Sequence, residues 1–298
     1  MTWLLVAISA YFLFAVVNIV DKYLLGGRIP SPKVYAFYTG VLGILILSLV
    51  PFGFLVIPKI SVIILALLAG AFHILGVFVF FVGLKTFEAS RIMPAMSALL
   101  PIFTLGFASV FAEKVLALSD ITAFVLLLAG TILITWEKTK TVTLKSIKIA
   151  ILAAFLFALY FITAKFVYLE QPFISGFIWT RIGAFLMVSF LLFSKEVRAD
   201  IRRPKIAQRK TWAIFLPNEL ASASGFILQN WAVALAPLAF LGIINVLEGI
   251  KFVFVLIFVT FLSLKFPQIL KEEISRKILF QKIIAILLIG GGLALLTF

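Results

Sequence analysis

The chain has 298 residues, of which 64% are hydrophobic and 13% are charged, and its mean hydropathy is +1.23. Soluble domains are nearer half apolar and a quarter charged, so this composition excludes a water-soluble fold and predicts an all-α membrane protein. The 26 Lys and Arg against 12 Asp and Glu give a formal charge of +14. Because these cations fall mostly between apolar runs, we interpret them as topology signals and contacts with membrane lipids, and not as a nucleic-acid surface.

Apolar runs of membrane-spanning length follow one another along the whole chain. A bilayer core about 30 Å thick needs about 20 apolar residues in a helix. Ten stretches meet or nearly meet this length, and the links between them are short, which predicts ten transmembrane helices in one integral membrane domain. In chain order the expected spans are 2–25, 33–57, 61–85, 91–112, 116–136, 145–168, 173–194, 212–235, 238–263 and 278–297.

The two halves of the sequence repeat each other. A shift of 143 residues lays Ala7–Lys22 on Ala150–Lys165 with nine identities in sixteen positions. We therefore expect two copies of a five-helix unit, residues 1–137 and residues 138–298. Further shifts, of 140 and 162 residues, pair Pro32, Phe37 and Gly43 with Pro172, Phe177 and Gly183, and Gly130, Leu133 and Thr135 with Gly292, Leu295 and Thr297.

An odd number of helices in each copy has a mechanical consequence. The second copy must enter the membrane from the opposite side, so the two repeats are inverted. Exchange of conformations between inverted repeats opens a central site first to one face and then to the other, which is the architecture of a transporter. The alternative is a duplicated bundle with no role in transport.

The distribution of Lys and Arg between the links predicts the orientation. Odd-numbered links carry 21 of these residues, even-numbered links carry three, and Arg181 and Lys251 lie inside spans. Because cytoplasmic links accumulate Lys and Arg, the odd links are expected in the cytoplasm and both termini on the other side. We expect the chain in the cell (inner) membrane.

Several local patterns mark the helices. The first helix of each copy ends in a Lys, and in the first copy the fourth helix opens with small residues and carries prolines, an acidic residue closes it, and the fifth helix contains a Gly. These segments are Asn18–Lys22, Ile162–Lys165, Glu88–Arg91, Met93–Pro94, Leu100–Pro101, Glu113 and Ala129–Ile134. Along essentially its whole length the chain resembles the drug/metabolite transporter superfamily, and within it the EamA type.

The resemblance implies ten helices and the export or uptake of small metabolites, often amino acids. The second copy departs from the family pattern at two positions, with Leu262 where Glu113 would fall and Ile250 in place of Pro101. A Lys in the middle of the ninth helix also resembles the sugar-phosphate and nucleotide-sugar branch of the superfamily, where basic residues meet phosphate.

Charged side chains inside the spans are the candidate site. A charge at bilayer depth costs about 2.5–3.5 kcal/mol, so it normally faces the bundle interior. In the ninth span Asn245, Glu248 and Lys251 share one helical face. Either they line the central site, with Lys251 meeting an anionic group, or Glu248 and Lys251 neutralise each other.

The seventh and eighth spans add further polar groups. Arg181 is expected either to hold a carboxylate or phosphate in two parallel hydrogen bonds or to pair with Glu170 or Glu219. In the eighth span Gln229 and Asn230 belong to a polar stripe that must avoid lipid, either by lining a cavity or by bonding between helices. Other members of this stripe are Glu219, Ser222 and Phe226.

Two further residues, His73 and Asn18, complete the candidate set. His73 is the only histidine, so it cannot build a zinc site, and it is expected to relay protons or to pack through a hydrogen bond. Asn18 shares a helical face with Lys22. We expect Lys22 and its repeat mate Lys165 to extend towards the headgroups as anchors.

The spans contain two cations and two acids in their interior, which suits a zwitterion or a small monoanion. The leading hypothesis is a secondary transporter that moves an amino acid or similar polar metabolite by alternating access, with Glu219, Glu248 or His73 as candidates for proton coupling. The alternatives are an exchanger of sugar phosphates or nucleotide sugars, and a membrane scaffold or lipid-binding subunit without transport. We expect no enzymatic activity, cofactor or metal site, because the sequence has no cysteine, nucleotide-binding motif or catalytic dyad.

Overall fold

The structure is a computed structural model that describes residues 2–25, 31–87, 89–112, 116–136, 143–202, 209–265 and 276–297. Every regular element in these residues is helical. In a lipid environment a helix satisfies all its backbone hydrogen bonds internally. The expected all-α fold class is confirmed. With η denoting a 3₁₀ helix, the elements are α1 (Thr2–Leu25), α2 (Pro32–Leu42), η1 (Gly43–Phe52), α3 (Ile60–Thr86), α4 (Ala89–Phe111), α5 (Leu118–Thr135), α6 (Leu144–Glu170), α7 (Phe173–Ser189), η2 (Phe190–Phe193), α8 (Lys195–Arg202), α9 (Arg209–Leu235), η4 (Leu238–Phe240), α10 (Leu241–Val246), α11 (Glu248–Lys265) and α12 (Arg276–Thr297).

The ten expected spans all coincide with helices or with consecutive helices. Eight of these are long and apolar enough to cross a membrane by length and composition. The two others are α4, whose apolar part Ala95–Phe111 is shorter, and α9, which contains Pro217 and a stripe of polar residues that lowers its hydropathy. Of the residues in the family-like patterns, Glu88 and Glu113 lie outside the described residues.

Local signals fix where several helices begin and end. Pro32 occupies the first turn of α2, where its missing N–H costs nothing. Thr143 begins α6 by accepting a hydrogen bond from the Ser146 backbone N–H at 3.3 Å. The second span ends earlier than the expected residue 57, because Gly53 adopts φ +79°, a left-handed conformation that terminates the 3₁₀ turn before it.

The ninth span is not the continuous helix that the sequence predicts. It consists of η4, α10 and α11, with a turn at Leu247 between the last two. Around this turn the Ile250 N–H donates to the Leu247 carbonyl at 2.9 Å, a spacing tighter than that of an α-helix. Interrupted helices are frequent at the binding sites of transporters.

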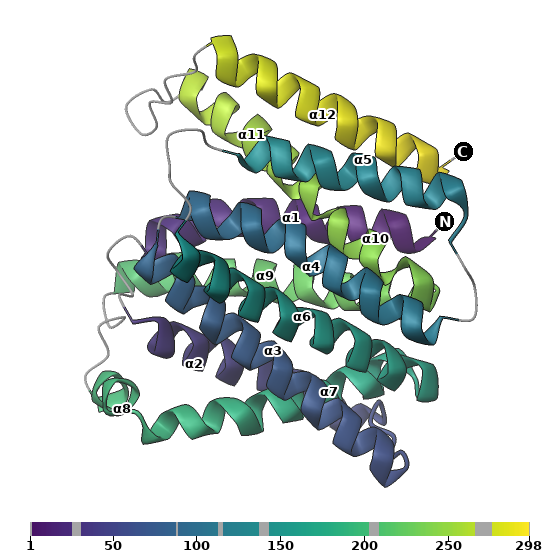
Figure 1. Ribbon diagram of the computed structural model, residues 1–298. Helices are drawn as coiled ribbons and strands as arrows, with labels where there is room; N and C mark the ends of the chain where they lie inside the picture. Colours follow the sequence, from purple (N-terminus) through teal and green to yellow (C-terminus); the bar gives the residue numbers. More distant parts are fainter. Residues whose placement is uncertain are drawn as a thin grey trace.

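The contact between α5 and α12 is made twice by equivalent residues. A Cβ added to Gly130 would lie 2.9 Å from the carbonyl oxygen of Ala285, and one added to Gly292 would lie 2.9 Å from that of Ala123. The shift of 162 residues that relates Gly130 to Gly292 also relates Ala123 to Ala285. Such reciprocity requires a two-fold relation between α5 and α12, which run in opposite directions side by side (Figure 1).

A second pair of contacts obeys the same relation. Phe14 of α1 packs on Gly225 of α9, and its repeat mate Phe157 of α6 packs on Gly76 of α3. Helices α1 and α6 run in opposite directions in Figure 1. The structure therefore consists of two inverted five-helix repeats, as predicted.

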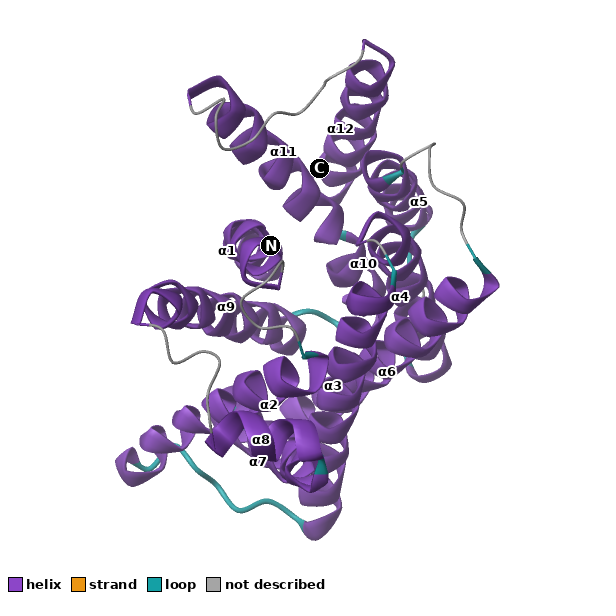
Figure 2. Cartoon of the chain, turned by 90° about the vertical axis from the view of Figure 1, so that its left-hand side faces the viewer, coloured by secondary structure: helices purple, strands orange, loops and turns teal. Residues whose placement is uncertain are grey.

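The helices gather into two bundles that each draw on both repeats. The first bundle contains α3, α4 and α6, with α2 and α7 packed on α3, and the second contains α1, α9, α10 and α11. Figure 2 shows α1 and α9 side by side, apart from α3, α4 and α6. We call the boundary between the two bundles the seam. Helix α10 packs on α4 across it, and α5 and α12 pair beside it.

The short helix α8 lies at the opposite end of the molecule from the start of α1 and the end of α12 (Figure 1). Its Glu196 carboxylate accepts hydrogen bonds from Ser31 at 2.9 Å and from Lys33 at 3.2 Å. These two bonds hold the pKa of the Glu196 carboxyl below its ordinary value, and the bond from Ser31 has the larger effect. Because Lys33 lies in α2 and Glu196 in the second repeat, the pair links the repeats at this end.

Replacing Gly130 or Gly292 with Ala should weaken the α5–α12 contact. The added methyl group collides with a backbone carbonyl, so each variant should lose about 1–3 kcal/mol of stability, measured by thermal unfolding in detergent. Gly290→Ala is the matched control on α12, because a Cβ there meets no atom within 4 Å. Equal stability of Gly130→Ala and Gly290→Ala would contradict the close two-fold packing.

Candidate functional site

A buried cation without a counter-ion lies at the seam. Arg181 occupies the middle of α7 and is 7% exposed. Its Nε and Nη2 atoms are buried and have no hydrogen-bond partner, and its guanidinium forms no ion pair with any described carboxylate. The expected alternative pairing with Glu170 or Glu219 is therefore not formed.

Aromatic rings from both bundles cover the faces of this guanidinium. Its central carbon lies 4.4 Å from the ring centroid of Phe226 in α9 and 5.3 Å from that of Phe177 in α7. Each cation–π contact stabilises a desolvated cation by up to about 2 kcal/mol but satisfies none of its N–H groups. The Nε–Nη2 edge of the guanidinium, which we call the free edge, has no acceptor among the described residues.

The Nε–H and Nη2–H groups define that free edge. They point in the same direction from one side of a planar group, which is the geometry that receives the two oxygens of one carboxylate. An unsatisfied buried donor costs about 1–3 kcal/mol, and more when it is charged, so an anion at this edge would be strongly stabilised.

His73 and two tyrosines surround Arg181 from α3 and α6. The His73 ring packs 5.0 Å from Tyr160 and 4.6 Å from Phe226, and its Nδ1 is buried without a partner. The hydroxyls of Tyr160 and Tyr168 both donate to the Asn230 side-chain oxygen, the latter at 2.9 Å. We call this group the seam cluster: His73, Tyr160, Tyr168, Phe177, Arg181, Phe226 and Asn230.

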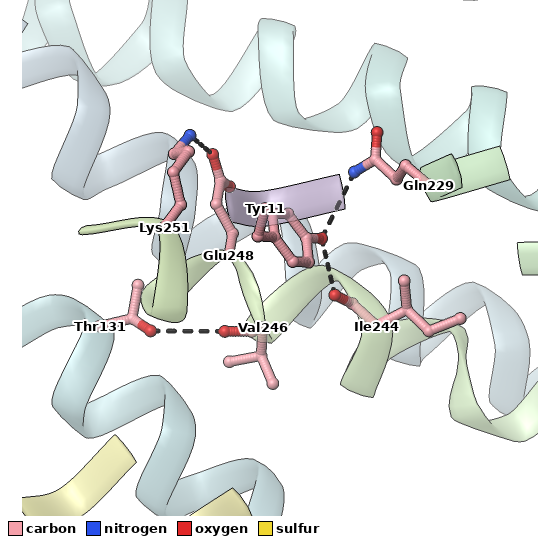
Figure 3. A network of polar contacts seen from close by, with 7 residues as sticks. All are labelled: Tyr11, Thr131, Gln229, Ile244, Val246, Glu248 and Lys251. Atoms are coloured by element: carbon pink, nitrogen blue, oxygen red, sulfur yellow. Dashed lines mark hydrogen bonds and ion pairs between the residues drawn. The ribbon is translucent and has the colours of Figure 1, made fainter. Parts of the chain in front are cut away.

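Lys251 and Glu248 form an ion pair one turn apart on α11. Only 10% and 16% of their side-chain surfaces are exposed, so their charges neutralise each other in a largely buried place. Figure 3 shows the pair above the turn of the ninth span, beside Tyr11 of α1. Of the two interpretations that the sequence allows, the ion pair is formed, and Lys251 is not a free cation.

Asn245 bridges the seam on the other side of this turn. Its amide nitrogen donates to Thr104 Oγ1 of α4 at 3.0 Å, while its buried side-chain oxygen has no donor. Thr104 in turn donates to the Leu100 carbonyl at 2.8 Å. The three residues that the sequence places on one face therefore have separate partners. Asn245 bonds to the other bundle, whereas Glu248 and Lys251 bond to each other.

Gln229 and Asn230 are neighbours on α9 but face different partners. Gln229 donates to the Tyr11 hydroxyl at 3.3 Å, and Tyr11 donates to the Ile244 carbonyl at 2.7 Å (Figure 3). Both contacts lie inside the second bundle, whereas Asn230 accepts hydrogen bonds from α6 of the first bundle. Helix α9 thus connects the ninth span with the seam cluster.

Two other expected site residues lie away from these groups. Glu219 is 9% exposed near the start of α9, beside Asn218, whose amide donates to Asp21 of α1 at 2.6 Å. Asn18 is half-buried on α1, three residues before Asp21, and it forms no hydrogen bond with the seam cluster within the part of the chain that the structure describes. Among the described residues no three His, Asp or Glu side chains gather as metal ligands.

Sequence reasoning misses two tyrosines and misplaces one lysine. Tyr160 and Tyr168 look like membrane-core aromatics in the sequence, yet both are buried hydrogen-bond donors. The expectation that Lys165 extends to the headgroups is wrong, because it is 3% exposed. Its repeat position near a helix end suggested exposure, but the end of α9 covers it.

A hollow of about 420 Å³ lies between α1, α9 and α11, apart from the polar groups. Its walls are apolar except for one hydroxyl, so it suits an acyl chain better than a polar solute. It is lined by Ile8, Ser9, Phe12, Leu13, Leu228 and Phe254.

Residues 1–136 match the model of the EamA-like transporter family. Over these residues the chain is similar to the EamA-like transporter family. Members of this family are membrane transporters of the drug/metabolite superfamily and not enzymes. Together with the apolar helices, the match identifies an integral, multi-pass membrane transporter.

A solved crystal structure whose name states no function is similar to the EamA-like chain over nearly its full length. The two share 15% sequence identity with a TM-score of 0.68, and the alignment covers 99% of this chain and 96% of the other. It is one of 19 solved chains that match. At this identity the likeness concerns the fold alone. No curated protein sequence matches the chain.

Breaking the Glu248–Lys251 pair should destabilise the protein more than removing it. In Glu248→Gln the Lys251 ammonium remains buried without a partner, so we expect a loss of about 3–5 kcal/mol. The double variant Glu248→Gln/Lys251→Met should recover most of this loss, because no uncompensated charge remains. Thermal unfolding of the singles and the double in detergent measures the coupling, and additive losses would contradict a mutually neutralising pair.

Proposed function

We propose that this protein is a secondary transporter that moves a small carboxylate-bearing polar metabolite, an amino acid or a similar compound, by alternating access. The observation that carries the proposal is the Arg181 guanidinium, buried at the seam with its Nε–Nη2 edge unbonded. A fold that retains an unpaired charge at this depth forgoes several kcal/mol unless a ligand occupies the edge.

The charge at the seam favours a monoanion. Arg181 is the one unpaired cation of the described seam cluster; outside the cluster Lys251 is neutralised by Glu248, and the Lys165 ammonium is bonded to backbone carbonyls. A carboxylate carries one negative charge and matches one guanidinium edge, whereas a phosphate monoester or a nucleotide sugar carries more negative charge than this cluster offsets. These charges weigh against an exchanger of sugar phosphates.

An unpaired acceptor supports a zwitterionic ligand. The side-chain oxygen of Asn245 is buried without a donor at the seam, as the guanidinium edge is buried without an acceptor. An ammonium group would supply the missing donor for Asn245, as a carboxylate would supply the missing acceptor for Arg181. A scaffold protein without a ligand has no use for either unsatisfied group.

Alternating access is proposed from the position of the site between inverted halves. The seam cluster combines Arg181, His73 and Tyr160 of the first bundle with Phe226 and Asn230 of the second. The two bundles are built from repeats that we propose to extend over residues 1–137 and 138–298. Motion of one bundle against the other would open the cluster to either face.

Proton coupling is proposed for Glu219. It is buried in α9 and forms no ion pair with a described cation, whereas Glu248 is paired with Lys251. A buried carboxyl without a cation is more stable when protonated, and exposure to water on one face would release the proton. His73, in contrast, packs among aromatic rings beside Arg181.

Substitution of Arg181 should abolish recognition of the carboxylate. Arg181→Gln and Arg181→Lys both lose the two-pronged edge, so affinity should fall about 10- to 100-fold, the effect of losing a hydrogen bond to a charged group. Thermal-shift titration against amino acids, their amides, sugar phosphates and nucleotide sugars measures binding, because a bound ligand raises the melting temperature.

The matched control for this titration is Arg198→Gln, which removes an exposed cation on α8 and should bind ligands normally. Amides should not bind, because they lack the carboxylate. If Arg181→Gln retains the affinity of the unsubstituted protein, or if only the phosphate compounds stabilise it, the proposal is wrong.

Both termini are proposed to lie on the non-cytoplasmic side of the cell membrane. Helix α8, which carries Lys195, Arg198 and Arg202, lies at the end away from the termini, and basic links remain in the cytoplasm. A reporter enzyme fused after Phe298 that works only outside the cytoplasm should be active. Activity of a cytoplasm-specific reporter at the same position would reverse this orientation.

A further inference from the structure

Lys165 bridges the seam near the end of α6. Its ammonium donates to the Ala234 carbonyl at 2.9 Å and to the Ala236 carbonyl at 2.6 Å, at the end of α9. The residue is 3% exposed and forms no ion pair with a described carboxylate. A buried ammonium thus has backbone carbonyls of the other bundle in place of an acid.

The end of α9 is suited to hold this cation. The carbonyls of the last helical turn have no intrahelical donors and carry the negative end of the helix dipole. Pro237 follows at once and supplies no N–H group. Lys165 therefore satisfies carbonyls that would otherwise be unpaired, and separation of α6 from α9 would break both bonds together.

The opposite end of the seam carries a bridge of different chemistry. The Tyr35 hydroxyl of α2, in the first bundle, donates to the Asp21 carboxylate of α1, in the second, at 2.7 Å. Asn218 of α9 donates to the same oxygen at 2.6 Å and so fixes Asp21 within its own bundle. Tyr35 packs at 6.0 Å against Phe215 of α9, which extends this contact between the bundles.

We propose that Lys165 is the clamp that closes the seam at the end of the molecule where the termini lie, and that Tyr35 and Asp21 close the opposite end. Along α9, Phe226 and Asn230 of the seam cluster lie between Asn218, at one clamp, and Ala234, at the other. In a transport cycle only one clamp opens at a time. This inference rests on the proposed alternating access, and it assigns the residues that gate each side of the site.

Because the chain contains no cysteine, the opening of each clamp can be followed by the reactivity of a single introduced thiol. Val233→Cys reports on the Lys165 end, because Val233 is 1% exposed and lies one turn from Asn230 on the same face of α9. Thr39→Cys reports on the other end, one turn from Tyr35 on α2. The reaction rate of each thiol with a polar maleimide in detergent measures opening.

Loss of the Lys165 clamp should open one end and close the other. In Lys165→Gln the Val233→Cys thiol should react about tenfold faster, the shift expected when a charge-assisted bond favouring one state is lost, while the Thr39→Cys thiol reacts no faster. Tyr35→Phe should give the reverse pattern. Lys148→Gln, an exposed lysine on the same helix α6, is the control and should change neither rate.

Two results would overturn the clamps. Equal acceleration of both thiols in Lys165→Gln means general loosening, and unchanged rates mean that Lys165 closes nothing. If Lys165→Gln does not fold, Tyr35→Phe alone decides, since it must accelerate Thr39→Cys without accelerating Val233→Cys. The labelling uses no ligand, so failure of the carboxylate assignment at Arg181 leaves this test intact.

Discussion

The reciprocal contact of Gly130 and Gly292 is the constraint on which the rest of the architecture depends. Each glycine brings one helix against the backbone of the other, and equivalent atoms meet on both sides. A contact of this kind holds two antiparallel helices about a two-fold axis, so the repeats that they end are necessarily inverted. The mixed bundles follow, because α6 of the second repeat completes α3 and α4 in the same way that α1 of the first completes α9 to α11.

Polar groups are concentrated where these bundles meet, and they differ in whether their buried atoms have hydrogen-bond partners. Lys251 is paired with Glu248, Lys165 is saturated by carbonyls, and Tyr160 and Tyr168 share the oxygen of Asn230. Each of these sets satisfies itself. Arg181 and Asn245 do not, since each keeps buried atoms without partners. In the hydrocarbon region such atoms have no water to bond to, so they remain without hydrogen-bond partners in this structure.

The sequence was sufficient for the spans, the repeats and their inversion, because hydropathy and identity at fixed shifts are properties of single residues and of order along the chain. It was insufficient for partners across the seam. The spacing of Glu248 and Lys251 allowed both a pair and a site lining, and only the burial of both side chains on α11 distinguishes them. The turn at Leu247 contains Gly249, but Gly is frequent inside transmembrane helices, so this residue alone does not predict an interruption. Tyr160 and Lys165 were misjudged because their roles depend on α9, which lies more than 60 residues away in the chain.

The adjacency of Gln229 and Asn230 has a mechanical meaning of its own. Successive residues of a helix point about 100° apart, so these two side chains touch α1 on one flank and α6 on the other at a single level of the membrane. Any turning of α9 about its long axis displaces both amides by the same angle. A rotation that takes Asn230 out of its bonds to the tyrosines therefore also moves Gln229 away from Tyr11. Because both residues belong to helix α9, the helix itself couples the seam cluster to the ninth span.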